Sequence, residues 1–569
     1  MKKNSLRLPA VISVVLFVLT LIPIILIAPF GHATGDDLGY GAHVMQALRE
    51  GTGVAGALSN IAGEIVSKWY TWQGTWASIF LFCIEPGVFG EKFYTIVPLL
   101  AVAMFCIGTG YFLYHFLTRV MRISGAAFIT IFSLLSILAI QYMPYMRGGI
   151  FWYTSVAHYL IPYCAAMVSA VFADRFLQSG QNKYLAGMCL LMTYLGGASY
   201  PAIVLSLELT LLLILYAAAD GRMSRRRLLI LLPLALMLAG FAVSAAAPGN
   251  KVRGGEGFGS RGAAGILMVI VNSVKVCAAR GARYFLQARP LILLLPITLG
   301  FAAEGCQARA DAAPAAGTAP DCVMPENAAP AEHMSGECGE AGMPRLLAFL
   351  RHPVTVAVLC FLTAAGVYTP EVYSAVDVSG GVPDTEYFVT LVMLVVALSY
   401  AGCALRRRAD RAARQQEASA CSASRQQGAY ACSAARQQEA YACFAARRHG
   451  LNMSMFFGAL VLCAVFGKHL IGNSVDYTCY TFWKSGQLSD YTRQMEEKLS
   501  ILQSDDTGDV LVPEMNNEQG PFMCMAEIDD PDNFNNASSA AFYGKRSVTA
   551  VPRQELVERG VLPPLRGEK

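Results

Sequence analysis

The chain alternates between long apolar runs and shorter polar or basic stretches. Two of the apolar runs, 184–198 and 199–218, are short and nearly meet at a Gly-Gly-Ala-Ser-Tyr-Pro sequence. Such a break suits a discontinuous helix pair whose freed backbone is covered by other protein. Runs near the roughly 20 residues that cross a bilayer as a helix are 8–30, 93–118, 123–143, 155–177, 184–198, 199–218, 227–247, 286–302, 353–370, 385–404 and 453–471. The pattern therefore predicts an all-α polytopic membrane bundle of about 11 transmembrane helices.

The composition supports this fold class. Of the 569 residues, 55% are hydrophobic and 15% are charged, whereas soluble domains carry about 25% charged residues. The net charge of +4 gives no reason to expect nucleic acid as a partner,. The first apolar run is too long for a cleavable signal peptide, so we expect it to remain as an anchoring helix.

Basic residues mark every second loop and so predict a topology. With the N-terminus in the cytoplasm, strict alternation places the basic loops inside, as the positive-inside rule expects. These loops carry Arg119 and Arg122, Arg175 and Lys183, Arg222 to Arg227, Arg345 and Arg351, and Arg406 to Arg448. The loop 31–92 and the region after residue 471 then lie outside. We expect a multi-pass protein of a bacterial plasma membrane, in contact with membrane lipids.

Six regions follow from the pattern. They are an N-terminal transmembrane bundle (1–302), a cytoplasmic low-complexity linker (303–352), two transmembrane helices (353–404), a cytoplasmic insert (405–450), the last transmembrane helix (451–471) and an extracytoplasmic C-terminal region (472–569).

The two inserts have unusual sequences. The linker holds Cys306, Cys322 and Cys338 at even spacing, but this matches no common metal-ligand pattern, and the composition favours a flexible linker. The insert contains an eleven-residue repeat over 414–446. That period suits a continuous helix, but a recent duplication in a permissive loop is the favoured explanation.

The C-terminal region has the pattern of a small α+β unit. Residues 510–513 predict a strand, 491–502 a helix with one apolar face, and 529–533 a turn,. Cys479 and Cys524 both lie in this region. A disulfide between them is compatible with an extracytoplasmic compartment.

An acidic pair, Asp36 and Asp37, follows the first apolar run within the loop 31–92. Aspartate is costly in lipid, so the pair should lie where the chain leaves the bilayer. Carboxylates at a membrane face can perform acid–base chemistry or hold a divalent cation. They can also simply cap the helix that follows, and adjacent side chains need not point the same way.

An aromatic cluster from Trp69 to Trp76 lies later in the same loop. Aromatic residues gather at membrane interfaces, so the cluster is either an interfacial anchor or a platform for a sugar. The apolar run 77–84 that follows is too short to span, and we expect it to lie at the membrane surface.

Four segments together resemble a known type of enzyme. They are 35–40, with its Gly-Asp-Asp and Tyr40; 71–92, with Trp72-Gln73-Gly74, Glu85-Pro86-Gly87 and Gly90-Glu91-Lys92; 247–253, Ala-Pro-Gly-Asn-Lys-Val-Arg; and 536–545. This combination resembles the GT-C type of polyprenyl-phosphate-sugar-dependent membrane glycosyltransferase. It is closest to a bacterial polytopic family of that type that is defined only as a domain of unknown function.

The resemblance implies an enzyme that takes a sugar from a polyprenyl-phosphate donor and transfers it, with inversion, to a glycan, lipid or protein of the cell envelope. Asp36 and Asp37 would be catalytic. Cofactors are undefined, with a divalent cation compatible. The substrate-binding residues would be Tyr40, Trp72, Gln73, Arg147, Trp152, Asn250, Lys251 and Arg253. The family pattern also implies an acidic residue after Arg147, where this chain has Gly148.

A second argument supports a binding role for Arg147, Lys251 and Arg253. The predicted topology places them in outer loops, where positive charge runs against the usual bias. Arginine binds phosphate well because of its forked geometry. They are candidates to bind the carrier phosphate or to contact lipid headgroups.

Two other assignments stay open. Glu208 lies within a predicted span, and an ionisable residue there is a functional candidate that could instead pair inside the bundle. His158 is either a packed residue or a second base. A transporter or flippase of lipid-linked glycans, and a non-catalytic envelope assembly protein, are the alternative functions.

Overall fold

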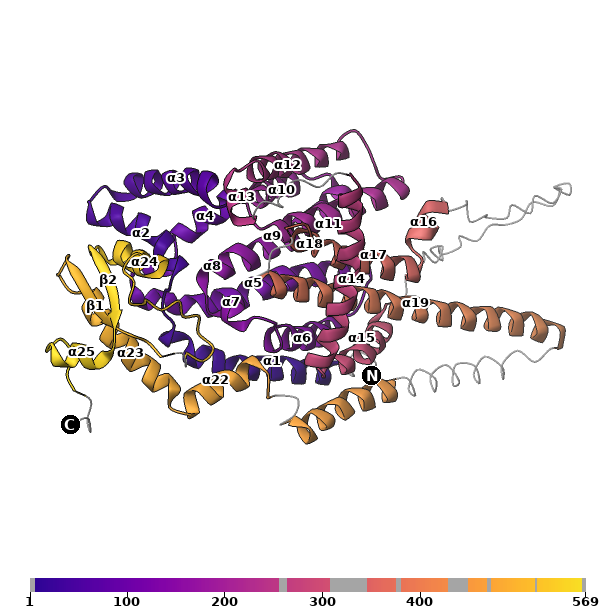
Figure 1. Ribbon diagram of the computed structural model, residues 1–569. Coiled ribbons are helices and arrows are strands. Elements are labelled where there is room, and N and C mark those ends of the chain that lie inside the picture. Colours follow the sequence, from indigo (N-terminus) through magenta and orange to yellow (C-terminus); the bar gives the residue numbers. More distant parts are fainter. Residues whose placement is uncertain are drawn as a thin grey trace, which may run out of the picture.

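The computed structural model describes residues 6–254, 263–307, 345–374, 380–427, 449–467, 472–516 and 519–564. Most of the helices run along one long axis, and the N- and C-terminal ends lie at opposite ends of it (Figure 1). A small region with two short strands closes the end that carries the C-terminus, and the long helix α19 (Val382–Gln427) projects from the other end.

Within the described residues, seven helical segments are long and apolar enough to cross a membrane. This is the character of a multi-pass membrane protein, as the sequence predicts. The seven are Arg7–Phe30, Glu91–Val120, Tyr153–Ser179, Tyr200–Ala219, Arg227–Ala245, Gly265–Gln287 and Val382–Ala413.

Five predicted spans correspond to shorter helices. Four of these are apolar helices of 10–17 residues: Gly125–Gln141, Leu291–Gly305, Pro353–Gly366 and His449–Val465. The fifth, 184–198, is the 15-residue helix α10 (Asn182–Gly196). A membrane thins locally, or flanking residues reach out to the interface, around helices of this length. The total of eleven spans stays a prediction.

One membrane-length helix is absent from the predicted set. Helix α14 (Ala263–Gln287) has 25 residues, and the sequence analysis counts no span there. Its apolar run is interrupted by Lys275, Arg280 and Arg283, so no stretch near 20 apolar residues stands out. Arg280 pairs with Glu371 and with Glu386, whose carboxylate lies 2.5 Å away. The predicted span 286–302 also begins five residues early, because α15 (Leu291–Gly305) starts after α14 has ended.

The predicted break between two short helices is present. Helix α10 ends at Gly196 and α11 (Tyr200–Ala219) begins four residues later. The carbonyl of Gly197 in the break accepts a hydrogen bond from the amide of Ala77, at 2.9 Å. The Trp76 ring covers Gly197 so closely that a Cβ atom there would lie 2.2 Å from it. The helix α4 (Trp76–Cys83) therefore supplies the cover that a broken helix pair requires.

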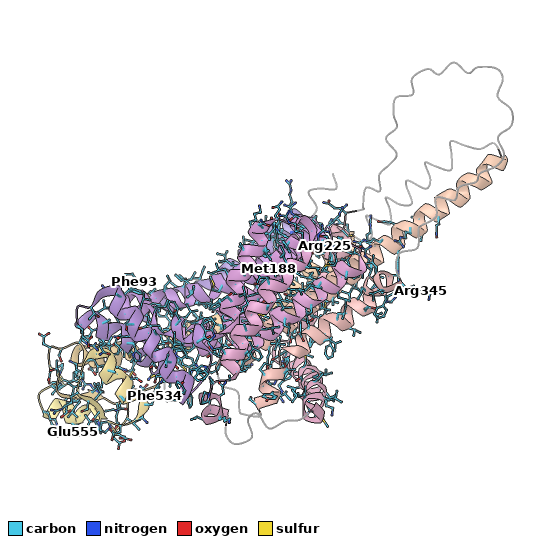
Figure 2. All side chains as sticks on the ribbon, turned by 90° about the horizontal axis from the view of Figure 1, so that it is seen from above. Phe93, Met188, Arg225, Arg345, Phe534 and Glu555 are labelled. Atoms are coloured by element: carbon cyan, nitrogen blue, oxygen red, sulfur yellow. The ribbon has the colours of Figure 1, made fainter. Side chains whose placement is uncertain are left out.

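The loops gather at two ends of the bundle. At one end, the Ser124 amide donates to Gly305, Arg226 to Asn182 and Arg351 to Asp220. At the other end, the loop 31–92, the segments around Arg147 and Asn250, and the C-terminal region contact one another. Figure 2 shows Arg225 and Arg345 at the first end and Phe93, Phe534 and Glu555 toward the second.

The C-terminal region combines short helices with a parallel strand pair. Its elements are α22 (Val475–Lys484), α23 (Gln487–Leu502), β1 (Asp509–Pro513), α24 (Phe534–Tyr543), β2 (Ser547–Val551) and α25 (Arg553–Glu558). β1 pairs with β2, so that Val510 lies opposite Val548. The strand predicted at 510–513 and the helix predicted at 491–502 are both present. Cys479 and Cys524 are free thiols, so no disulfide joins them.

The inserts lie only partly within the described structure. Helix α19 continues through the first copy of the eleven-residue repeat, 414–424, as a continuous helix requires. The remaining copies fall mostly in 428–448, outside the described residues. Most of the linker, 308–344, including Cys322 and Cys338, also lies outside them.

Candidate functional site

The acidic pair opens helix α2 (Asp36–Arg49), at the same end of the bundle as the C-terminal region. Gly35 precedes it with φ of +52°, and a Cβ atom there would lie 2.3 Å from the Met525 sulfur. A side chain at position 35 would be strained and would also clash. The Met525 amide donates to the Thr34 hydroxyl at 2.9 Å. The start of α2 is therefore fixed against the C-terminal region.

Asp37 is fully buried and fully partnered. Its Oδ1 accepts hydrogen bonds from the Thr154 amide at 2.9 Å and the Thr154 hydroxyl at 2.5 Å. Its Oδ2 accepts from the Tyr94 hydroxyl at 2.5 Å, and Tyr94 in turn accepts from the Tyr153 amide. Burial raises the pKa of Asp37 to about 6, even though these hydrogen bonds favour the charged form. Asp37 joins α2 to the bundle and has no oxygen left for a substrate.

Asp36 is half-buried, and its carboxylate makes no hydrogen bond within the described residues. Burial raises its pKa, while the positive charges of Arg253 and Lys68 act in the opposite direction. Neither aspartate caps α2 with its side chain, so capping does not account for the pair. Both still lie in the first helical turn, where the helix dipole favours negative charge.

Lys68 comes from α3 (Gly53–Thr71), and the sequence analysis did not select it. Its ammonium lies 5.6 Å from the centre of the Tyr40 ring and 3.4 Å from the Glu64 carboxylate. Glu64 is buried and also accepts from His43 Nε2 at 3.1 Å. The Glu64–Lys68 spacing of four residues is visible in the sequence, but only the packing of α3 on α2 directs it toward Asp36.

Arg253 reaches the site from α13 (Gly249–Gly254). Its guanidinium lies 5.8 Å from the Trp72 ring centre and donates to the Gln73 side chain. The Tyr159 hydroxyl is a further hydrogen-bond partner of Arg253. Arg253 itself remains exposed, so part of its guanidinium is open to a ligand. Trp72, 44% exposed, lies next to that open side.

Two of the segments selected from the sequence pack directly together. The Asn250 side chain accepts from the Gly74 amide at 3.1 Å and donates to the Ser244 carbonyl at 2.8 Å. A Cβ atom on Gly249 would lie 2.4 Å from the Trp72 backbone nitrogen. Asn250 therefore holds the two loops together and is itself buried.

Three predicted binding residues have no hydrogen bond or ion pair with the aspartates among the described residues. Lys251 is exposed and has no hydrogen bond or ion pair within the described residues. Arg147 donates to the Gly520 carbonyl of the C-terminal region at 3.1 Å. The Trp152 indole nitrogen is buried without a partner among the described residues, two positions before Thr154. Arg147 thus joins the bundle to the C-terminal region.

Glu85 is a buried carboxylate near Asp37 that the sequence analysis did not select as a site residue. Its Oε2 accepts from the Gly87 amide at 2.6 Å, whereas Oε1 has no partner among the described residues. Burial, together with the nearby Asp37 charge, raises the pKa of Glu85.

The last segment of the resemblance has a structural role. The Asn536 amide donates to the carbonyls of Ile528 and Val548. Lys545 donates to the carbonyls of Ser504 and Asp506. These bonds hold the C-terminal region together.

Neither His158 nor Glu208 has a hydrogen bond to the acidic pair among the described residues. The His158 ring packs 5.5 Å from the Phe82 ring and 4.5 Å from the Tyr159 ring. Glu208 contacts Gly366 on α17 (Pro353–Gly366), where a Cβ atom would lie 1.8 Å from its carboxylate. Oε2 of Glu208 has no partner within the described residues.

The described residues contain no group of three or more His, Cys, Asp or Glu side chains that could hold a metal ion. No family model, curated protein or solved structure matches the chain. The likeness to GT-C enzymes thus rests on the sequence segments alone.

Proposed function

We propose that the protein is a membrane glycosyltransferase that moves a sugar from a polyprenyl-phosphate carrier to an acceptor of the cell envelope. The proposal rests on the environment of Asp36. Its carboxylate is half-buried, has no hydrogen bond in the described structure, and interacts electrostatically with the positive charges of Lys68 and Arg253. A base next to two cations, at the end of an apolar bundle, suits a lipid-phosphate substrate.

Asp36 would act as the general base. It removes the proton from an acceptor hydroxyl while the acceptor oxygen bonds to the anomeric carbon of the donor sugar. The bond between that carbon and the phosphate oxygen breaks, and the polyprenyl phosphate leaves with the electron pair. Burial keeps the pKa of Asp36 above its ordinary value, which makes the ionised carboxylate a stronger base.

Arg253 and Lys68 would balance the charge of the phosphate. The guanidinium of Arg253 can donate two parallel hydrogen bonds to phosphate oxygens. Preorganised cations stabilise the negative charge on a leaving group at little cost in reorganisation. Asp37 would position Asp36 by fixing the first turn of α2.

The proposed orientation follows from the two ends of the bundle. The end that carries Arg225 and Arg345 would face the cytoplasm, because basic loops stay inside (Figure 2). Asp36 and the C-terminal region would then face outward, in the leaflet where an envelope acceptor is available.

Replacing Asp36 tests the proposal. In membranes given labelled polyprenyl-phosphate sugars and envelope acceptors, Asp36→Asn should lower the transfer rate by about 10²–10⁴-fold, the usual contribution of a general base. Glu50→Gln, an exposed acid that follows the same helix, is the matched control and should transfer normally. Transfer by Asp36→Asn at the wild-type rate would refute the proposed role.

A further inference from the structure

A cavity lies on the side of α2 that carries Met45 and Arg49. It has a volume of about 430 Å³ and is open to solvent. Its walls come from α2, from the segment 87–91 and from the C-terminal region, through Leu502, Gln503, Ser504, Phe542 and Tyr543. Small-ligand pockets fall in the range of about 300–1,000 Å³. The cavity is therefore large enough to hold a small molecule.

This cavity is separate from the Asp36 site. Met45 and Arg49 line it from α2. At about 100° per residue, Met45 lies about 180° around the helix from Asp36. Asp36 and Tyr40 face α3, whereas Met45 and Arg49 face the C-terminal region. A ligand in the cavity would not touch Asp36.

The lining combines an exposed ring with polar groups. The Phe89 side chain is 68% exposed, while Leu502 and Phe542 form a buried apolar floor. The side-chain amide of Gln503 makes no hydrogen bond among the described residues, and the side chain is exposed. The Tyr543 hydroxyl lies 3.4 Å from the Glu91 carboxylate.

The charges in the cavity argue against an anionic ligand. The guanidinium of Arg49 already donates to the carbonyls of Phe542, at 2.6 Å, and Ala541, at 2.8 Å. Glu91 adds a negative charge and is held by His32 at 2.6 Å. The arginine and the glutamate together leave the cavity close to neutral. A neutral ligand with many hydroxyl groups matches this lining better than a phosphate.

We propose that this cavity binds a carbohydrate of one or two sugar units. The C–H face of a sugar ring would pack on Phe89, and its hydroxyl groups would bond to Gln503, Glu91 and Tyr543. This binding does not require the transfer reaction. If the transfer reaction also holds, the cavity would retain a distal part of the acceptor glycan.

Binding can be measured directly. Full-length protein in lipid nanodiscs would be titrated with glucose, galactose, mannose, N-acetylglucosamine and their disaccharides, with saturation-transfer NMR as the readout. We expect at least one sugar to bind to wild type, and Phe89→Ala and Gln503→Ala each to weaken that binding by about tenfold or more. Phe93→Ala is the matched control, since Phe93 is 60% exposed and lies outside the cavity lining.

Each outcome decides the proposal. Wild-type protein that binds no sugar of the panel would overturn it, as would Phe89→Ala binding with unchanged affinity. Phe93→Ala should bind sugar like wild type. Loss of sugar binding in this variant would place the sugar site outside this cavity and would overturn the proposal. Asp36→Asn separates the two proposals, because it should greatly lower the transfer rate while sugar binding persists.

Discussion

The two adjacent aspartates differ in what surrounds them. Asp37 accepts three hydrogen bonds from Thr154 and Tyr94 and is sealed inside the protein. Asp36 accepts no hydrogen bond from the described residues, and it interacts electrostatically with the positive charges of Lys68 and Arg253. Successive helical side chains point about 100° apart, which separates the pair into one fixed and one available carboxylate. Only the second can meet a substrate.

The pKa of Asp37 gives a prediction about stability. Its folded-state value is about 6, against an ordinary value of 3.8, so the folded protein holds this proton more tightly than the unfolded chain does. The stabilisation is complete below about pH 4 and is lost as the pH rises through about 6, a difference of about 3 kcal/mol. Wild-type Tm should therefore fall between pH 4 and pH 7.

Asp37→Asn should flatten this pH dependence. The amide keeps an oxygen for Thr154 but cannot ionise. The measurement is Tm in nanodiscs at several pH values, with Glu50→Gln as the control that keeps the wild-type slope. Parallel curves for wild type and Asp37→Asn would contradict the assignment.

At the residue scale, the sequence identifies candidate site residues, but it does not show where they lie in the fold. The Gly-Asp-Asp sequence is visible because carboxylates are costly beside a membrane span. Lys68 could not be placed near Asp36, because that proximity depends on how α3 packs on α2. Arg147 has the residue type that binds phosphate, yet it donates to Gly520. Tertiary packing decides between such uses of one side chain.

At the scale of elements, the site depends on how closely α13 packs on the end of α3. Gly249 lies so near the Trp72 backbone that no side chain fits there. The helix α13 carries Arg253 four residues further on. A displacement of about 1 Å at a reacting group can cost about a hundredfold in rate. The small residue at 249 therefore controls where the guanidinium lies.

Gly249→Ala should displace Arg253 and lower kcat/KM for the lipid donor by about ten- to a hundredfold. Gly63→Ala in α3 is the matched control, because no atom lies within 4 Å of the Cβ position there. Its alanine should be neutral or stabilising by up to about 1 kcal/mol. Donor kinetics with both variants test the relationship, and equal activity of Gly249→Ala and wild type would contradict it.

The length of the apolar runs in the sequence identifies most of the membrane-length helices but not all of them. The runs around Arg7–Phe30 and Val382–Ala413 are apolar enough to be recognised. Helix α14 is not, since three basic residues divide its apolar sequence and one of them, Arg280, is paired with carboxylates from other helices. Those partners are 91 and 106 residues away, so single-sequence periodicity does not reveal them.

At the scale of the whole molecule, the two groups of loops predict the orientation in the membrane. A reporter enzyme that works only outside the cytoplasm, fused after Lys569, should be active. The same reporter fused after Gln307 should be inactive, because that position lies at the end with the basic loops. The reversed pattern would place Asp36 on the cytoplasmic side and would remove the basis for an envelope acceptor.

The C-terminal region packs over the start of α2, and this packing can form only late in the synthesis of the chain. Gly35 lies against Met525 and Gly39 against Ser538, about 500 residues later in the chain. At about 5–20 residues per second, a ribosome needs roughly half a minute to two minutes to make that length. During this time the nascent acidic loop has no cover. A chain released early by interrupted translation would lack the cover permanently, so only finished polypeptides would carry a complete site.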